Sequence, residues 1–87
     1  SKMIEREIEI KDPIGIHARP AALLVKTLKE FKSELKLEKD GKVASSKSLI
    51  QIMGLGAKQG DKLKITAEGE DAEEMMNAFL EFAKDNL

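Results

Sequence analysis

The sequence contains no cysteine, and this absence excludes both a disulfide framework and a zinc site built on thiolates. A chain without cysteine fits a reducing compartment, so we expect a cytoplasmic protein. Aromatic residues are also scarce, with three phenylalanines and neither tyrosine nor tryptophan. Acidic and basic residues nearly balance, 16 against 15, which gives a formal net charge of −1. Without a basic surface or aromatic stacking platforms, we expect no direct nucleic-acid partner.

Long apolar runs are missing as well. No segment approaches the roughly 20 apolar residues of a membrane span, and the opening SKMIEREIEI lacks the apolar region of a signal peptide. We therefore expect no membrane insertion. The chain has no linker, repeat or low-complexity segment, so residues 1–87 are expected to form one domain with one modest core. Charged residues make up 36% of the chain, rich in Lys and Glu, a composition that leans towards a thermophilic source.

Strand and helix patterns alternate along the chain. Period-two alternation predicts strands over 3–10, 34–38 and 62–67, and a return strand that begins at Val43 after a type I′ turn at Asp40-Gly41. Helical spacing predicts a helix from Ala18, a short serine-capped helix over 49–53 that Gly54 or Gly56 ends, and a last helix from Asp71. The expected buried stripes are Ala21, Leu24, Val25, Leu28 and Phe31 in the first helix, and Ala72, Met75, Met76, Phe79, Leu80 and Ala83 in the last. The order β-α-β-β-α-β-α predicts one sheet with helices on one face and its Glu- and Lys-bearing face in water.

The only histidine lies in GIHARPA, residues 15–21. A helix that begins directly after His17, with Pro20 in its first turn, leaves the N–H groups of Ala18 and Arg19 unsatisfied. The helix dipole favours an anion there and disfavours an imidazolium. A neutral imidazole is a nucleophile, and a phosphoryl group placed on it would meet both N–H groups and the Arg19 guanidinium. Gly15 allows the tight turn that uncovers the ring.

Other interpretations of this histidine stay open on spacing alone. A lone histidine at a helix start is often a cap or a surface residue. A metal site is disfavoured, since no second histidine and no cysteine exist. Carboxylates such as Asp12 could assist the ring, but nothing in the sequence fixes them beside it. A Ser-His-Asp triad is conceivable, although no nucleophile elbow is present.

GIHARPA, followed by KSLIQIMGLG at 47–56, resembles the HPr family, the histidine-containing phosphocarrier proteins of the bacterial phosphoenolpyruvate-dependent sugar phosphotransferase system. The resemblance covers the whole chain. It implies an α+β open-faced β-sandwich, with a four-stranded antiparallel sheet and three helices on one face. It also implies that His17 accepts a phosphoryl group on Nδ1 from enzyme I and donates it to enzyme IIA domains, that Arg19 neutralises the phosphate, and that partner enzymes catalyse both steps without a bound cofactor.

The second motif implies regulation. Ser48 aligns with the serine that HPr kinase/phosphorylase modifies with ATP in Gram-positive and related bacteria. A phosphoserine there would add about −2 charges near the surface on which partner proteins are expected to dock. The repulsion would prevent an acidic partner from binding. The plainer alternative is that Ser48 is only an N-cap, with Ser45 and Ser46 as competitors. Three positions depart from the family pattern: Ile14 replaces a small polar residue, and Gln51 and Gly54 stand where Gly and Ser are common.

Exposed apolar residues of the short helix predict a docking patch. The resemblance assigns this patch to Ala18, Ala22, Leu49, Ile50 and Met53, whereas Met75, Met76 and Phe79 are expected to be core only. Three further functions compete with the sugar phosphocarrier: a corepressor that acts through phosphoserine on a catabolite-control transcription factor, a carrier in a non-sugar phosphotransferase branch, and a small interaction module with an incidental histidine. A transient partner of several proteins is expected to be a monomer.

Overall fold

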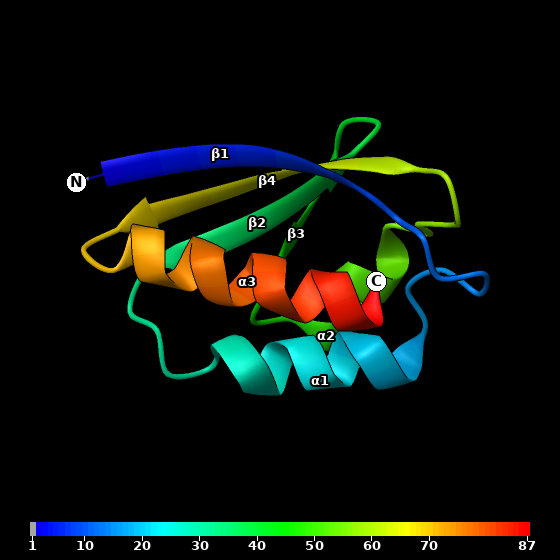
Figure 1. Cartoon of the computed structure of the whole chain (residues 1–87), viewed down its shortest axis with the longest axis horizontal. Coiled ribbons are helices and arrows are strands. Elements are labelled where there is room, and N and C mark those ends of the chain that lie inside the picture. Colours follow the sequence, from blue (N-terminus) through cyan, green and yellow to red (C-terminus); the bar gives the residue numbers. More distant parts are fainter. Residues whose placement is uncertain (1) are drawn as a thin grey trace.

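The computed structural model describes residues 2–87, and it places three helices on one side of a four-stranded sheet (Figure 1). The elements follow one another as β1 (Lys2–Glu9), α1 (Ala18–Leu28), β2 (Glu34–Lys39), β3 (Lys42–Ser45), α2 (Leu49–Gly54), β4 (Lys62–Gly69) and α3 (Ala72–Asn86). This order confirms the predicted β-α-β-β-α-β-α open-faced sandwich.

Every pair of neighbouring strands is antiparallel, in the order β1-β4-β2-β3. The two sequence-adjacent strands, β2 and β3, form a hairpin whose loop consists of Asp40 and Gly41. Both loop residues have positive φ, 51° and 82°, as a type I′ turn requires. The predicted turn is therefore confirmed.

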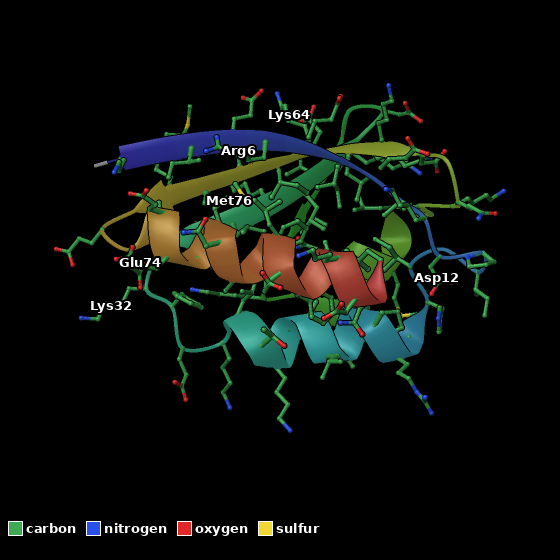
Figure 2. The ribbon with its side chains drawn as sticks, viewed as in Figure 1. Arg6, Asp12, Lys32, Lys64, Glu74 and Met76 are labelled. Atoms are coloured by element: carbon green, nitrogen blue, oxygen red, sulfur yellow. The ribbon has the colours of Figure 1, made fainter. Side chains whose placement is uncertain are left out.

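The core lies between the inner face of the sheet and the helices. Strand residues such as Leu37 and Ile65 are fully buried against Leu24 of α1 and Phe79 of α3. Figure 2 shows the two sides of the sheet, with Met76 on the helical side and Lys64 on the other. The predicted core roles of Met75, Met76 and Phe79 are confirmed.

Three details differ from the predicted stripes, and the first is that Val25 of α1 is only partly buried. Helix α1 ends at Leu28, so Phe31 packs against the core from the following loop. In α3, Phe82 is buried, while Leu80 and Ala83 are only partly buried. Positions three and four residues apart both lie on one helix face, so the pattern alone does not decide which of Leu80, Phe82 and Ala83 is turned fully inwards.

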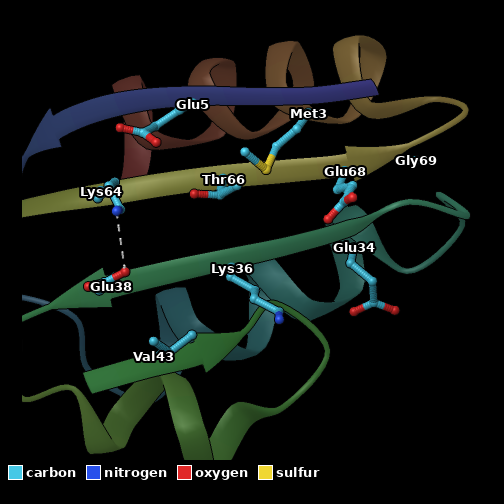
Figure 3. Close-up of a pocket in the computed structure, with 10 residues that line it drawn as sticks. All are labelled: Met3, Glu5, Glu34, Lys36, Glu38, Val43, Lys64, Thr66, Glu68 and Gly69. Atoms are coloured by element: carbon cyan, nitrogen blue, oxygen red, sulfur yellow. Dashed lines mark ion pairs between the residues drawn. The ribbon is translucent and has the colours of Figure 1, made fainter. Parts of the chain in front are cut away.

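The outer face of the sheet carries alternating charged and polar side chains (Figure 3). On this face, the side chains of Met3 and Val43 are 63% and 52% exposed, and Lys64 lies 3.7 Å from Glu38. The predicted wet face of Glu and Lys is confirmed. Across residues 2–87, no helix is both long and apolar enough to cross a membrane.

Asp71 ties the start of α3 to the loop between α1 and β2. The last helix begins at Ala72, one residue after the predicted start, and Asp71 is its N-cap residue, but the Asp71 side chain makes no cap hydrogen bond. Instead its carboxylate accepts hydrogen bonds from Lys32 N at 3.0 Å and Ser33 N at 2.8 Å, and Ser33 Oγ accepts one from Asp71 N at 3.1 Å. Hydrogen bonding with the Ser33 side chain first, and then with these backbone N–H groups, lowers the pKa of Asp71 to about 2.

Candidate functional site: a histidine at the start of α1

The loop before His17 is held by hydrogen bonds at both of its ends. Lys11 N and Asp12 N both donate to Leu87 O, at 2.7 and 2.8 Å. The Asp12 side chain accepts from Ile14 N at 2.8 Å, and its carbonyl accepts from Gly15 N at 2.9 Å. The sequence alone did not fix the position of Asp12, and the structure holds this residue through its own turn and through the end of α3. Figure 2 shows Asp12 at the end of the molecule where α1 begins and α3 finishes.

Gly15 is the residue that lets this loop lie close to its neighbour. Its φ is +82°, and a Cβ built there would lie 2.4 Å from Ala57 O. The same carbonyl accepts a hydrogen bond from Ile16 N at 3.1 Å. Only glycine combines this conformation with this close approach, and the local position of His17 depends on both.

His17 is the N-cap residue of α1, with an extended backbone and a carbonyl that accepts from Ala21 N at 3.1 Å. Its imidazole makes no cap hydrogen bond and is partly exposed. Within residues 2–87, the N–H groups of Ala18 and Arg19 find no acceptor, and Pro20 has no N–H to offer. The first turn of α1 therefore presents two free N–H donors next to an uncapped imidazole, with the exposed Arg19 side chain on the same turn. This arrangement favours an anion beside the ring.

A shallow hollow of about 250 Å³ opens beside this ring. Its lining is Asp12, His17, Arg19, Pro20, Leu23, Asp85 and Asn86. The last turn of α3 thus belongs to the site, which the sequence analysis missed. No local motif marks Asp85 or Asn86, because they reach His17 only through the packing of α3 against α1.

The three serines before α2 have different surroundings. Ser48 is the N-cap residue, and its Oγ accepts from Gln51 N at 3.2 Å. The Gln51 side chain accepts in turn from Ser45 N at 2.9 Å, and Ser45 Oγ accepts from Lys47 N at 3.1 Å. The side chain of Ser46 is buried, and its hydroxyl has no partner among the described residues. The N-cap position predicted for a serine thus belongs to Ser48, and Gly56, at φ +62°, follows the end of the helix.

The five residues of the predicted docking patch are all exposed. Ala18 and Ala22 lie on α1, while Leu49, Ile50 and Met53 lie on α2, with side chains 38%, 84% and 42% exposed. The two helices pack against each other. Ile14 and Leu23, which the sequence analysis did not include, are also large, apolar and exposed. In the described chain, residues 2–87, no group of three or more His, Cys, Asp or Glu side chains is placed to hold a metal ion.

Sheet, helices and histidine together define a class: a small open-faced α+β sandwich in which a helix start suited to an anion lies beside one partly exposed imidazole. Comparison with known proteins identifies the family within this class. The family model described as "PTS HPr component phosphorylation site" matches residues 4–85, and the chain belongs to the HPr family of phosphocarrier proteins.

Individual relatives agree. The chain is 49% identical over 73 residues to the phosphocarrier protein HPr of Mycoplasma pneumoniae, a match covering 83% of each chain. It is 40% identical over 80 residues to the HPr-like protein Crh of Halalkalibacterium halodurans, covering 92% of this chain and 95% of that one. The crystal structure of HPr from Thermoanaerobacter tengcongensis matches with a TM-score of 0.89 and 44% identity, over 95% and 93% of the two chains. The multiphosphoryl transfer protein of Salmonella typhimurium is 40% identical over 79 residues, but this match spans only 21% of that longer protein.

Proposed function

We propose that this chain is a cytoplasmic phosphoryl carrier for sugar uptake. In this function His17 accepts a phosphoryl group from phosphorylated enzyme I and passes it to an enzyme IIA domain, and the partner enzymes catalyse both transfers. The observation that carries the proposal is the partly exposed His17 at the start of α1, whose imidazole makes no cap hydrogen bond. It lies beside two N–H groups without acceptors among the described residues and on the same turn as the Arg19 guanidinium. Membership of a phosphocarrier family supports it independently.

The geometry suits a reversible transfer. An imidazole nitrogen, which we assign to Nδ1, attacks the phosphorus, and the new P–N bond replaces the bond between phosphorus and the donor. The Ala18 and Arg19 N–H groups and the guanidinium then meet the phosphoryl oxygens, which places positive partial charges against the charge that arrives. Transfer to the acceptor reverses these events. The chain itself needs only to hold the phosphoryl group, because each partner in turn can approach the exposed side of the His17 ring and catalyse its own transfer step.

The patch of Ala18, Ala22, Leu49, Ile50 and Met53 is proposed to dock these partners one at a time. Its apolar side chains are exposed on two helices in contact with each other. A patch of this kind on a small protein marks a protein-binding surface. Since the carrier must release each partner quickly, we expect a monomer that forms small, short-lived interfaces.

The proposal is tested by measuring the intact mass of the protein after incubation with enzyme I, Mg²⁺ and phosphoenolpyruvate. We expect the gain of one phosphoryl group that is lost in acid and absent from the His17→Ala variant. Addition of an enzyme IIA domain should return the carrier to its original mass. If folded protein and active enzyme I give no gain in mass, the carrier function is wrong.

We further propose that Ser48 is the site of regulatory phosphorylation by HPr kinase/phosphorylase. Its hydroxyl is partly exposed at the N-cap of α2, and the first turn of α2 holds no acidic residue that would repel a phosphate. The added charge would stand next to Leu49 and Ile50 of the docking patch. With kinase and ATP, we expect a phosphoryl gain that Ser48→Ala abolishes and Ser45→Ala retains. The modified protein should then accept phosphoryl groups from enzyme I more slowly.

A second candidate function is a corepressor that binds a catabolite-control transcription factor through phosphorylated Ser48. The observation that favours it is the match to an HPr-like Crh protein over nearly the whole of both chains. The His17→Ala variant separates the two functions, because it abolishes phosphoryl transfer but leaves serine-dependent binding intact. A carrier in a non-sugar branch would be recognised by transfer to acceptors other than sugar-specific enzyme IIA domains.

A further inference from the structure

Two carboxylates share the hollow with His17 and Arg19. Asp12 belongs to the loop before α1, and Asp85 belongs to the last turn of α3. The loop of Asp12 leads directly into α1, whereas the last turn of α3 is far from both in the sequence, yet together they line a space of only about 250 Å³. The hollow thus brings one guanidinium, one imidazole and two acidic groups together.

None of the three charged groups is neutralised by an ion pair. Among the described residues, no oppositely charged atom lies within 4.0 Å of the charged atoms of Arg19, Asp12 or Asp85. The one hydrogen bond to the Asp12 carboxylate comes from Ile14 N, through Oδ1. Both carboxylates therefore keep their charge available to whatever occupies the hollow.

The backbone that carries each of the two carboxylates is also held in place. Asp12 N donates to Leu87 O at 2.8 Å, which fixes the loop to the end of α3. Asp85 lies in the helix between Lys84 and Asn86, and Asn86 Nδ2 donates to Phe82 O at 3.0 Å. Because the backbone at each position is held, these charges cannot move far away when a phosphoryl group arrives.

We infer that the carboxylates of Asp12 and Asp85 weaken the interaction between the site and a phosphoryl group on His17. They thereby favour transfer of this group to the next protein. This inference rests on the proposed carrier function. A phosphoryl group on the ring brings about −2 charges into the hollow. The carboxylates repel it and compete with it for Arg19, whereas the unmodified ring meets no such repulsion. The phosphorylated state is therefore destabilised relative to the free state.

The carboxylates and the phosphoryl group all face water, which weakens the repulsion between them and limits the size of the effect. In a solvated hollow of this size, each carboxylate should change the equilibrium by about two- to fivefold, and the pair by about three- to tenfold. A site so tuned holds the group firmly enough to carry it and loosely enough to release it. Salt at high concentration should reduce the effect, since the hollow is open to solvent.

The test uses Asp12→Asn, Asp85→Asn and the double variant, with Glu81→Gln as a matched control on the exposed side of α3. Asparagine keeps the oxygen that accepts from Ile14 N, so the turn is retained, and Asp85 is exposed, so its variant folds without rearrangement. Phosphoramidate phosphorylates the imidazole without enzyme I, and ³¹P NMR follows the lifetime of the product at neutral pH. Enzyme I with phosphoenolpyruvate and pyruvate gives the transfer equilibrium.

We expect the double variant to shift the equilibrium towards phosphorylated His17 by about three- to tenfold and to lengthen its lifetime, with smaller shifts for the single variants. Asp85→Glu keeps the negative charge, so its equilibrium should stay close to that of the wild type. Equal equilibria in the double variant and the Glu81→Gln control, or a shift towards the unphosphorylated form, would overturn the inference. A wild-type chain that enzyme I never phosphorylates contradicts the carrier function instead, so the two failures are distinguishable.

Discussion

Asp71 makes the stability of the protein depend on pH in the acid range. Because hydrogen bonds in the folded state lower its pKa to about 2 from an ordinary 3.8, the folded state binds this proton less readily than the unfolded state. The stabilisation is complete above about pH 4 and is lost as the pH falls through about 2. We expect Asp71→Asn to lower the urea midpoint at neutral pH and to flatten its dependence on pH between about pH 4 and pH 2.

Urea denaturation of the wild type and the variant at several pH values measures this dependence. Glu81→Gln on the same helix is the control, and its midpoint should follow that of the wild type throughout the acid range. Parallel curves for the wild type and Asp71→Asn would show that the hydrogen bonds to Lys32 and Ser33 do not couple to folding.

Ser46 and Ser48 should respond oppositely to the same substitution. Ser46 is 1% exposed, and its hydroxyl has no partner in the described chain, so Ser46→Ala should leave the free energy of unfolding unchanged or raise it by up to about 1 kcal/mol. Ser48 caps α2 through Gln51 N, so Ser48→Ala should lower it by about 1 kcal/mol. Thermal or chemical unfolding of the two variants compares them directly. A large loss of stability in Ser46→Ala would mean that its hydroxyl has a partner such as a bound water.

For single residues, the sequence could predict the roles that depend only on neighbours along the chain. His17 and Ser48 both come directly before an apolar helical stripe, and the structure makes Ser48, rather than its competitors Ser45 and Ser46, the N-cap residue of α2. The contribution of Asp85 could not be predicted, because it depends on how the end of α3 meets the loop at Asp12 across the fold. Spacing along one segment contains no information about such a meeting.

At the scale of elements, the loop that carries His17 depends on a single glycine. Gly15→Ala would combine a positive φ with a Cβ 2.4 Å from Ala57 O, whereas Gly41→Ala meets the same φ of +82° with nothing within 4 Å. We expect Gly41→Ala to cost about 1 kcal/mol of unfolding free energy from strain alone, and Gly15→Ala to cost clearly more, about 2–4 kcal/mol.

Denaturation of both variants measures this difference, and phosphorylation by enzyme I measures its effect on the site. Phosphorylation of His17 should slow in Gly15→Ala and stay normal in Gly41→Ala. Equal stabilities for the two variants would mean that the loop moves away from Ala57 at no cost.

Elements with strong local signals were predictable throughout. Alternation identified the strands, and the Asp40-Gly41 pair identified the hairpin turn, because both depend on neighbours in sequence. The buried side of α3 was only partly predictable. Phe82 and Leu80 both continue a helical stripe, and the packing against the sheet and α1 decides that Phe82 is the buried one.

At the scale of the whole molecule, function is expected on the helical side alone. Ile50 and Val43 are both exposed apolar residues, at 84% and 52%, but Ile50 lies in the proposed docking patch and Val43 on the outer face of the sheet. We expect Ile50→Asp to lower kcat/KM for phosphorylation by enzyme I at least tenfold, as loss of a central interface contact does. Val43→Asp should leave it within about twofold. Ile50→Asp should lower stability by no more than about 0.5 kcal/mol, and Val43→Asp by about 1 kcal/mol, because aspartate disfavours a strand and would lie opposite Glu38. A greater loss of transfer in Val43→Asp would move the docking surface to the sheet.

The pairing of β1 with β4 has a consequence for the order of folding. Lys2 lies opposite Gly69 and Glu9 opposite Lys62, so the edge strand β1 pairs with the strand that is furthest from its partner in sequence among the three strand pairs. The β2–β3 hairpin closes across two residues and can form early, whereas β1 must wait for the ordering of nearly all the intervening chain. The loop of His17 follows directly after β1, and Ile10 N donates to Asp61 O where the strand ends. We therefore expect the end of the molecule that carries His17 to be completed late, after the rest of the sheet has assembled.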